Sequence, residues 1–296
     1  MITIPALVLL LSVAGSVLAQ AQDSTPAERF AAIPWQEGGT GRLGSIAEVK
    51  VPAGCRFTGK AGTQTFLELT ENPWGDTEEG TIACRDSSGA DSHSFFIIFT
   101  FDDMGYVKDD ERDELDADAM LKSMQEGTKQ GNEERSERGW ATLTLVGWDQ
   151  PPFYDTRTNN LTWATRLRAS DADSDGLNHS VRLLGRGGVM SVDLVMGPDE
   201  KAAALPVLDE IVAGFTYLPG QRYAEWRTGD KVDAVGLTGL VVGGAGAIAA
   251  KTGLLGKLGK MLVAAGKAAL VALIAVGAWL KKKFFSSESP SDQPRA

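Results

Sequence analysis

The sequence has few of the residues and motifs on which most catalytic sites depend. Its 296 residues include only two histidines, and neither His93 nor His179 has a neighbour that marks it as catalytic. No serine lies in the Gly-x-Ser-x-Gly pattern of a nucleophile elbow. The glycines of residues 38–41 lack the Gly-Lys-Ser/Thr sequence of a phosphate-binding loop, so they are predicted to form a turn. The sequence therefore gives no sign of a nucleophilic triad or of a P-loop.

Cysteine is equally scarce, because Cys55 and Cys84 are the only two in the chain. In an exported domain these thiols are expected to form a disulfide bond, and two buried free thiols are the alternative. A zinc site would need about four ligands, and only the two histidines could join the thiols. No metal or other cofactor is predicted.

Positive charge is rare before residue 251. The whole chain carries −10 at pH 7 and residues 251–296 carry +6, which leaves −16 for residues 1–250. A domain this acidic repels nucleic acid and anionic lipid headgroups, so nucleic-acid binding is excluded for it. The basic C-terminal part is instead typical of the cytoplasmic side of a membrane anchor.

Both ends of the chain carry signals of export and anchoring. Residues 1–21 are predicted to be a signal peptide, with an apolar run at residues 4–11 and a small-x-small site at residues 17–19. An uncleaved signal anchor is the alternative. Residues 22–42 are predicted to be a polar lead-in, and residues 286–296 a disordered tail.

Residues 231–285 are predicted to form a glycine-rich membrane anchor region. Residues 234–250 contain no charge, and residues 262–280 are interrupted only by Lys267. A spanning helix needs about 20 mostly apolar residues, so the second segment is long enough if Lys267 snorkels, while the first is shorter. The lysines at 281–283 then mark the cytoplasmic end. A single membrane helix and a helical hairpin both remain open.

Residues 43–230 are predicted to form one acidic α+β domain. Alternating apolar residues indicate strands at 46–51, 80–84, 142–146, 162–167, 179–184 and 189–195, and residues 95–101 are apolar on both faces, as in a central strand. Helical spacing favours helices near 63–71, 116–139 and 198–212, followed by a short strand at 215–217. This order predicts an antiparallel sheet with packed helices, a sandwich similar in element order to the PsbP/Mog1-like arrangement.

The first candidate site is an acidic loop directly after the predicted central strand. It contains Asp102, Asp103, Asp109, Asp110 and Glu111. Paired carboxylates can act as general acid and base when burial separates their pKa values, and they can also bind a hard cation. Such a run is more often a solvated approach to a helix. Asp109 and Asp110 are the candidates for catalysis.

The second candidate is an aromatic cluster that includes Trp148, Tyr154 and Trp163 around Pro151-Pro152. If exposed, these rings would form a stacking platform for a sugar or a peptide; if buried, they form core beside a rigid Pro-Pro turn. Arg186, between glycines of a predicted hairpin loop at 185–188, could bind an anion or cap a loop carbonyl.

A third pattern is the run Asp171, Asp173 and Asp175, which has the opening of a calcium-binding loop. An EF-hand requires a glutamate at loop position twelve, and Arg182 occupies that position here. The flanking segments also have strand patterns rather than helical ones. We therefore predict a polar hairpin loop.

The stretch from Phe95 to Ala164 resembles the signature of DUF2167, an uncharacterised family of membrane-anchored bacterial proteins. The resemblance is carried by residues 95–101, the acidic loop to Glu111, and the aromatic segments 147–155 and 161–164, and it covers roughly residues 30–285. It carries no assigned activity. Together with the signal-like residues 1–21 and the lysines at 281–283, it predicts a protein of the bacterial inner membrane with the acidic domain in the periplasm or outside the cell.

We therefore expect a non-catalytic binding or regulatory module in the cell envelope. Its partners would be the lipid bilayer, through the C-terminal segment, and an envelope protein. The alternative is a hydrolase-like enzyme that uses Asp109 or Asp110 as a general base beside the aromatic cluster. The candidate binding residues are Asp102, Tyr106, Trp148, Tyr154, Trp163 and Arg186.

Overall fold

The computed structural model describes residues 24–85, 94–234 and 236–242. The predicted signal peptide, His93, the apolar segment 262–280 and the predicted tail lie outside the described residues. Among the helices of the described part, none is long and apolar enough to cross a membrane.

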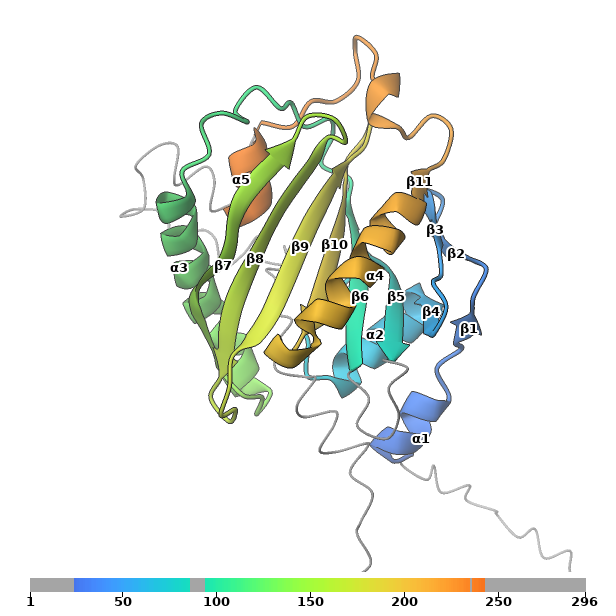
Figure 1. Cartoon of the computed structure of the whole chain (residues 1–296), viewed down its shortest axis with the longest axis vertical. Coiled ribbons are helices and arrows are strands. Elements are labelled where there is room, and N and C mark those ends of the chain that lie inside the picture. The colour runs from blue at the N-terminus through green and yellow to red at the C-terminus, as the bar shows by residue number, and fades with distance from the viewer. Residues whose placement is uncertain (1–23, 86–93, 235, 243–296) are drawn as a thin grey trace, which may run out of the picture.

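An antiparallel sheet forms the centre of the domain (Figure 1). In the described residues it has eight strands in the order β1-β4-β5-β6-β10-β9-β8-β7. Their bounds are β1 (Gln36–Glu37), β4 (Cys55–Gly59), β5 (Glu78–Arg85), β6 (Ser94–Asp102), β7 (Leu143–Asp155), β8 (Asn160–Ala169), β9 (Gly176–Leu184) and β10 (Val189–Met196). A smaller sheet, in the order β11-β3-β2, contains β2 (Thr40–Leu43), β3 (Ala47–Lys50) and β11 (Phe215–Tyr217).

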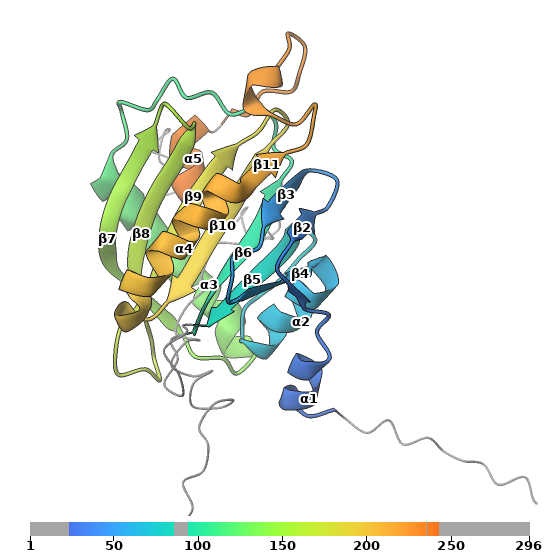
Figure 2. The ribbon, with the colours of Figure 1, turned by 45° about the vertical axis from the view of Figure 1, so that its right-hand side comes forward.

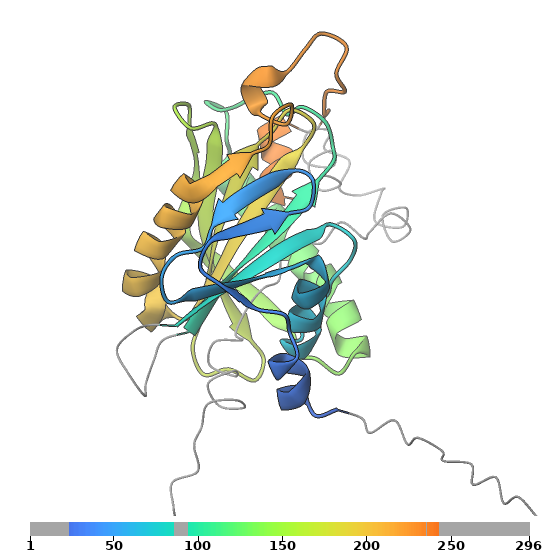
Figure 3. The ribbon, with the colours of Figure 1, turned by 90° about the vertical axis from the view of Figure 1, so that its right-hand side faces the viewer.

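Helices cover both faces of the large sheet. Their bounds are α1 (Pro26–Ala31), α2 (Lys60–Leu69), α3 (Ala117–Glu137), α4 (Lys201–Gly214) and α5 (Gly236–Val242), with short 3-10 turns η1 (Pro198–Glu200) and η2 (Tyr223–Glu225). The small sheet and α4 lie on one face (Figure 2), and α2 and α3 lie on the other (Figure 3). The predicted α+β sandwich of an antiparallel sheet with packed helices is thus observed.

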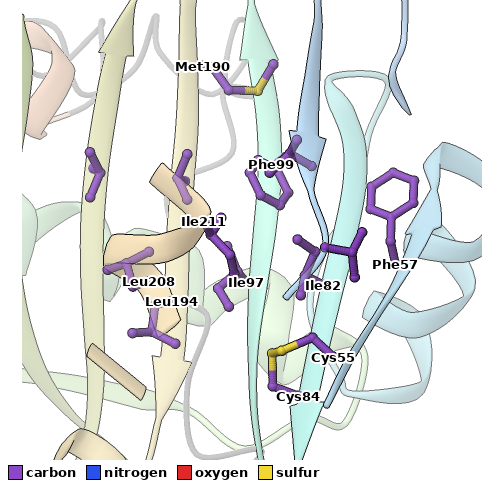
Figure 4. Close-up of a cluster of buried hydrophobic side chains, with 14 of the residues drawn as sticks. Cys55, Phe57, Ile82, Cys84, Ile97, Phe99, Met190, Leu194, Leu208 and Ile211 are labelled. Atoms are coloured by element: carbon purple, nitrogen blue, oxygen red, sulfur yellow. A yellow bond between two sulfur atoms is a disulfide. The ribbon is translucent and has the colours of Figure 1, made fainter. Parts of the chain in front are cut away.

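The apolar strand β6 occupies the central position that its sequence predicts. Ile97 and Phe99 point into the core under α4, where Leu208 and Ile211 also pack (Figure 4). The alternate residues Phe96 and Ile98 pack on the opposite face against α2. Because both faces of β6 are buried, its sequence shows no apolar–polar alternation.

Helix α3 begins and ends where its sequence signals indicate. The side chain of Asp116 caps it, since its Oδ1 accepts a hydrogen bond from the Ala119 amide at 3.0 Å. Just beyond the other end, Gly139 adopts a φ of +71°, which favours glycine. Only Met120, Met124 and Arg135 are buried along its length, as expected for a helix lying on a sheet.

Tyr217 joins the small sheet to the large one. Its hydroxyl donates to the Leu183 carbonyl at 2.7 Å and accepts from the Met190 amide at 2.9 Å. Burial raises the pKa of Tyr217 above its usual value, so the phenol stays neutral and can fill both roles.

The folded domain is longer at both ends than the predicted range 43–230. The segment predicted to be a polar lead-in contains α1, β1 and most of β2, and the segment predicted to start the anchor contains α5. Helix α1 has six residues and β1 only two, too few to show a reliable period. Helix α1 does carry a local start signal, a capping box formed by Thr25 and Glu28 with Pro26 at its first position, while β1 forms through its pairing with β4.

The segment around Pro151-Pro152 is part of a strand and not a turn. Strand β7 continues to Asp155 along the edge of the large sheet, with register shifts on both sides of Gln150. Prolines are tolerated there because an edge strand has one side without ladder hydrogen bonds, and bulges absorb the missing donors.

Cys55 and Cys84 form a disulfide bond between neighbouring strands. The two residues lie directly opposite each other in the register of β4 and β5, and their side chains are buried in the main core (Figure 4).

Replacing both cysteines, as Cys55→Ser with Cys84→Ser, should lower the free energy of unfolding by about 3–4 kcal/mol, because the bond closes a loop between residues 29 apart. Urea unfolding of the full-length chain in detergent would measure the loss. Wild-type protein kept in reductant is the control and should lose a similar amount. An unchanged midpoint in the double variant would contradict the prediction.

Candidate functional site

Three connections meet at the end of the sheet where β6 terminates. They are residues 103–111 after β6, the hairpin loop 185–188 between β9 and β10, and residues 218–233 after β11. All three lie at the upper end of the molecule in Figure 1. We call this surface the loop face. It contains most of the acidic loop that the sequence singled out.

Backbone hydrogen bonds hold the three connections of the loop face together. The Gly105 amide donates to the Gly187 carbonyl at 2.9 Å, and the Tyr106 amide donates to the Lys231 carbonyl at 2.8 Å. The Asp233 amide returns a bond to the Tyr106 carbonyl at 2.9 Å. The acidic loop is therefore fixed on both sides by chain segments that are distant in sequence.

Gly105 is required by this close approach. Its φ of +105° is unfavourable for residues with a side chain, and a Cβ at this position would lie 2.9 Å from the Lys231 carbonyl oxygen. Any larger residue would push the acidic loop away from residues 231–233.

Arg186 binds a carboxylate of the chain itself. Its Nε and Nη2 donate to the two carboxylate oxygens of Asp230 at 2.7 and 2.8 Å, in a bidentate ion pair. The hydrogen bonds from Arg186, together with the Arg227 amide, lower the pKa of Asp230 to about 2. The sequence suggested that Arg186 could bind an anion. In this structure that anion is the Asp230 carboxylate of the same chain.

A pocket of about 270 Å³ lies between the three connections. Its lining includes the cations Arg186 and Lys231 and the carboxylates Asp103 and Asp230. The mixture of both charge signs with glycine backbone suits a small polar group better than an apolar one.

Three aromatic rings, two of them stacked and the third tilted, contact one another on the loop face. The Tyr106 and Tyr223 rings are nearly parallel at a centroid distance of 4.5 Å, and the Trp226 ring lies 5.3 Å from Tyr106. The Tyr223 hydroxyl donates to the Val107 carbonyl at 3.0 Å, and burial raises the pKa of Tyr223. Trp226 remains 38% exposed. This stack places an exposed aromatic side chain on the loop face.

The sequence predicted only one ring of this stack, Tyr106. The pair Tyr223 and Trp226 lies in a turn-rich segment with a Pro-Gly dipeptide, which indicates a loop and nothing more. The signal that could have found it is two aromatics three residues apart in an otherwise polar loop. Their contact with Tyr106 depends on the fold.

The carboxylates of the acidic loop have separate environments. Asp109 Oδ2 accepts a hydrogen bond from the Tyr154 hydroxyl at 3.2 Å and lies 3.6 Å from Arg112 Nη1. Burial, and then the negative charge of Asp109, raise the pKa of Tyr154. Asp110 is exposed, and the Glu111 carboxylate lies at the start of α5, 3.5 Å from the Thr238 amide. Asp109 and Asp110 thus do not form a paired acid–base site.

Asp102 lies outside this arrangement, at the end of β6. Desolvation raises the pKa of its carboxyl although the residue keeps contact with solvent; the charges of Asp193 and Glu78 act in the same direction, and Arg182 opposes them. Its neighbours on this face of the sheet are themselves polar and buried.

Trp163 belongs to that buried polar region and not to a surface platform. It is 1% exposed, and the Arg182 guanidinium lies 4.6 Å from its ring. Arg182 also pairs with the Asp193 carboxylate at 3.0 Å, to which the Ser180 hydroxyl donates at 2.6 Å. This network connects β9 and β10 through buried side chains.

The other predicted aromatics are also tied to structure. The Trp148 indole donates to the Ala117 carbonyl at 3.1 Å and so connects β7 to the start of α3. Tyr154 is buried, and Phe153 is the exposed member of the cluster. Trp148 therefore contacts a helix, and Tyr154 and Trp163 lie in the core, so the three rings do not form an exposed stacking platform.

The predicted calcium-like run forms the hairpin connection between β8 and β9, as expected from its flanking strands. Asp175 is paired with Arg168 at 2.7 Å, while Asp171 and Asp173 are exposed. A search of the described residues finds no group of three or more acidic, histidine or cysteine side chains placed to hold a metal ion.

Comparisons with known proteins place the chain in a family without giving it an activity. The family model described as "Protein of unknown function (DUF2167)" matches residues 36–277. A search of curated proteins found no match. Among solved structures, the chain is similar to cyanobacterial PsbP (CyanoP) from Synechocystis sp. PCC 6803, with 14% identity and a TM-score of 0.33 over 62% of this chain and 98% of that one.

The ion pair between Arg186 and Asp230 predicts a measurable titration. Because the pKa of Asp230 is lowered from 3.8 to about 2, the stabilisation of this pair is present above pH 3.8 and is lost as the pH falls through about 2. Arg186→Gln should move the pKa back towards 3.8, followed by NMR of the Asp230 carboxyl carbon. Arg157→Gln, which removes an exposed partner of Asp155, is the control and should leave Asp230 unchanged. Titration of wild-type Asp230 near 4 would contradict the geometry.

Proposed function

Because the chain belongs to DUF2167, a family of proteins of unknown function, we propose a function from its own geometry. It is a non-catalytic binding or regulatory module of the bacterial cell envelope. The domain stands on the extracytoplasmic side of the inner membrane, and the C-terminal segment anchors it in the lipid bilayer. The loop face binds an envelope protein.

The observation that carries this proposal is the construction of the loop face. Three distant connections are joined by backbone hydrogen bonds and by the Arg186–Asp230 ion pair, so the surface is organised before any partner arrives. Preorganisation lowers the entropy lost on association. The exposed Trp226 and the polar pocket of the same loop face supply the aromatic and charged groups that are enriched in binding hot spots.

Two further features support a location outside the cytoplasm. The disulfide between Cys55 and Cys84 suits an oxidising compartment, since cytosolic thiols are normally kept reduced. The signal-like residues 1–21 and the basic residues 281–283 fit export of the domain with the C-terminal end left inside.

The alternative, a hydrolase-like enzyme, lacks a specific observation in its favour. A general base must reach the group that it deprotonates and is usually oriented by another residue. Asp109 is hydrogen-bonded to Tyr154 and close to Arg112, and Asp110 is exposed. In the part of the chain that the structure describes, neither carboxylate has a histidine or serine as a hydrogen-bond partner.

Replacing Trp226 should separate binding from folding. We expect Trp226→Ala to reduce recovery of the partner about tenfold in a crosslinking pull-down from membranes, because an exposed tryptophan on a binding surface is the type of residue that dominates binding energy. The matched control is Trp74→Ala, which removes another exposed tryptophan, on the connection between α2 and β5. It should leave recovery unchanged.

Two outcomes would count against the binding module. Equal recovery with wild type and Trp226→Ala would show that the loop face is not the binding surface. If solubilised full-length protein hydrolyses a substrate in a screen, and Asp110→Asn abolishes that activity while partner recovery is unchanged, the hydrolase alternative would replace the proposal.

A further inference from the structure

The first apolar segment of the predicted anchor begins inside the folded domain. Residues 234–250 are uncharged, but seven of them form α5. Leu237, Val241 and Val242 are buried in a core cluster with Met120 of α3 and Trp163 of β8. Figure 1 shows α5 beside α3 at the edge of the sheet. A helix packed on the domain in this way cannot cross the bilayer at the same time.

The acidic loop holds this segment on the domain at three points. Tyr106 forms a parallel bridge with Val232, through its bonds to residues 231 and 233. Gly105 lies against the Lys231 carbonyl. The Glu111 carboxylate lies at the N-terminal end of α5, next to Gly236 and the Thr238 amide. Its negative charge interacts favourably there with the positive end of the helix dipole.

We propose that the acidic loop is a latch that keeps residues 231–242 on the domain, and that the chain therefore crosses the membrane only once, at residues 262–280. After α5, eight residues of the first apolar segment remain, far fewer than the roughly 20 that a spanning helix needs. Lys251, Lys257 and Lys260 then stay on the same side as the domain. The helical hairpin that the sequence left open is excluded by this arrangement.

The charge distribution agrees with a single crossing. Residues 281–296 contain four Lys or Arg residues, and residues 243–261 contain three. The positive-inside rule therefore still leaves the C-terminal end in the cytoplasm, although the margin is small. The inference rests on the membrane anchoring of the proposed function and adds its topology and the role of the acidic loop.

Thiol labelling in spheroplasts tests the topology. The native cysteines are joined in a disulfide, so an impermeant maleimide reports only an introduced thiol. In full-length chains, Thr252→Cys should be labelled in intact spheroplasts, and Ser286→Cys only after lysis. The opposite labelling pattern would mean two crossings. It would overturn the single-crossing inference and leave the proposed membrane anchoring intact. Release of the chain by an alkaline wash would instead overturn the anchoring.

Hydrogen exchange tests the latch independently of the membrane. In the purified full-length chain, Glu111→Ala should increase exchange of the α5 amides roughly fivefold, as expected for the loss of a helix-terminal partner. Asp110→Ala, at the exposed neighbouring position, is the matched control and should change nothing. Glu111→Gln keeps a hydrogen-bond acceptor but removes the charge, so it should increase the exchange of the α5 amides less. It serves as the test if Glu111→Ala does not fold. Unchanged exchange in both Glu111 variants would overturn the latch.

Discussion

The position of β6 between β5 and β10 is the constraint on which the rest of the structure depends. Seven registered pairs join β6 to β10, from Val189 opposite Asp102 to Val195 opposite Phe96. Because β10 begins where β6 ends, the hairpin before β10 must lie beside the acidic loop after β6. This one long-range pairing thus brings together two of the three connections of the loop face, and the third, residues 218–233, follows β11 of the small sheet. Pairing across this sequence distance costs loop-closure entropy, which the apolar faces of β6 offset by burial.

The acidic loop contains residues in two different environments, which its composition alone does not distinguish. Its backbone at Gly105 and Tyr106 and the side chain of Glu111 connect it to the end of the domain. Other carboxylates of the loop, such as Asp110, are exposed to solvent. A run of carboxylates after a strand can therefore reflect the docking of a C-terminal segment as much as chemistry.

The sequence by itself determined the parts that short-range physics controls. Period-two apolar patterns located most of the long strands, and a run that is apolar on both faces located the central one. The capping residue Asp116 and the terminal glycine Gly139 set the limits of α3. The acidic loop was also identifiable, since it follows the central strand directly. These signals are read within about ten residues, and the fold did not override them.

Only the tertiary structure decided the elements and contacts that interactions between sequence neighbours do not stabilise sufficiently. Helix α5 and strand β1 are too short to be stable alone; α5 forms by packing and β1 by pairing with β4. Helix α5 is the most important difference from the sequence-based prediction, which assigned its residues to the membrane anchor. An apolar, glycine-rich segment is compatible with a membrane and with a domain core equally well. The stack of Tyr106, Tyr223 and Trp226 joins segments more than a hundred residues apart. The sequence specifies such residues, but only the folded chain brings them together, because their attraction acts only at contact distance.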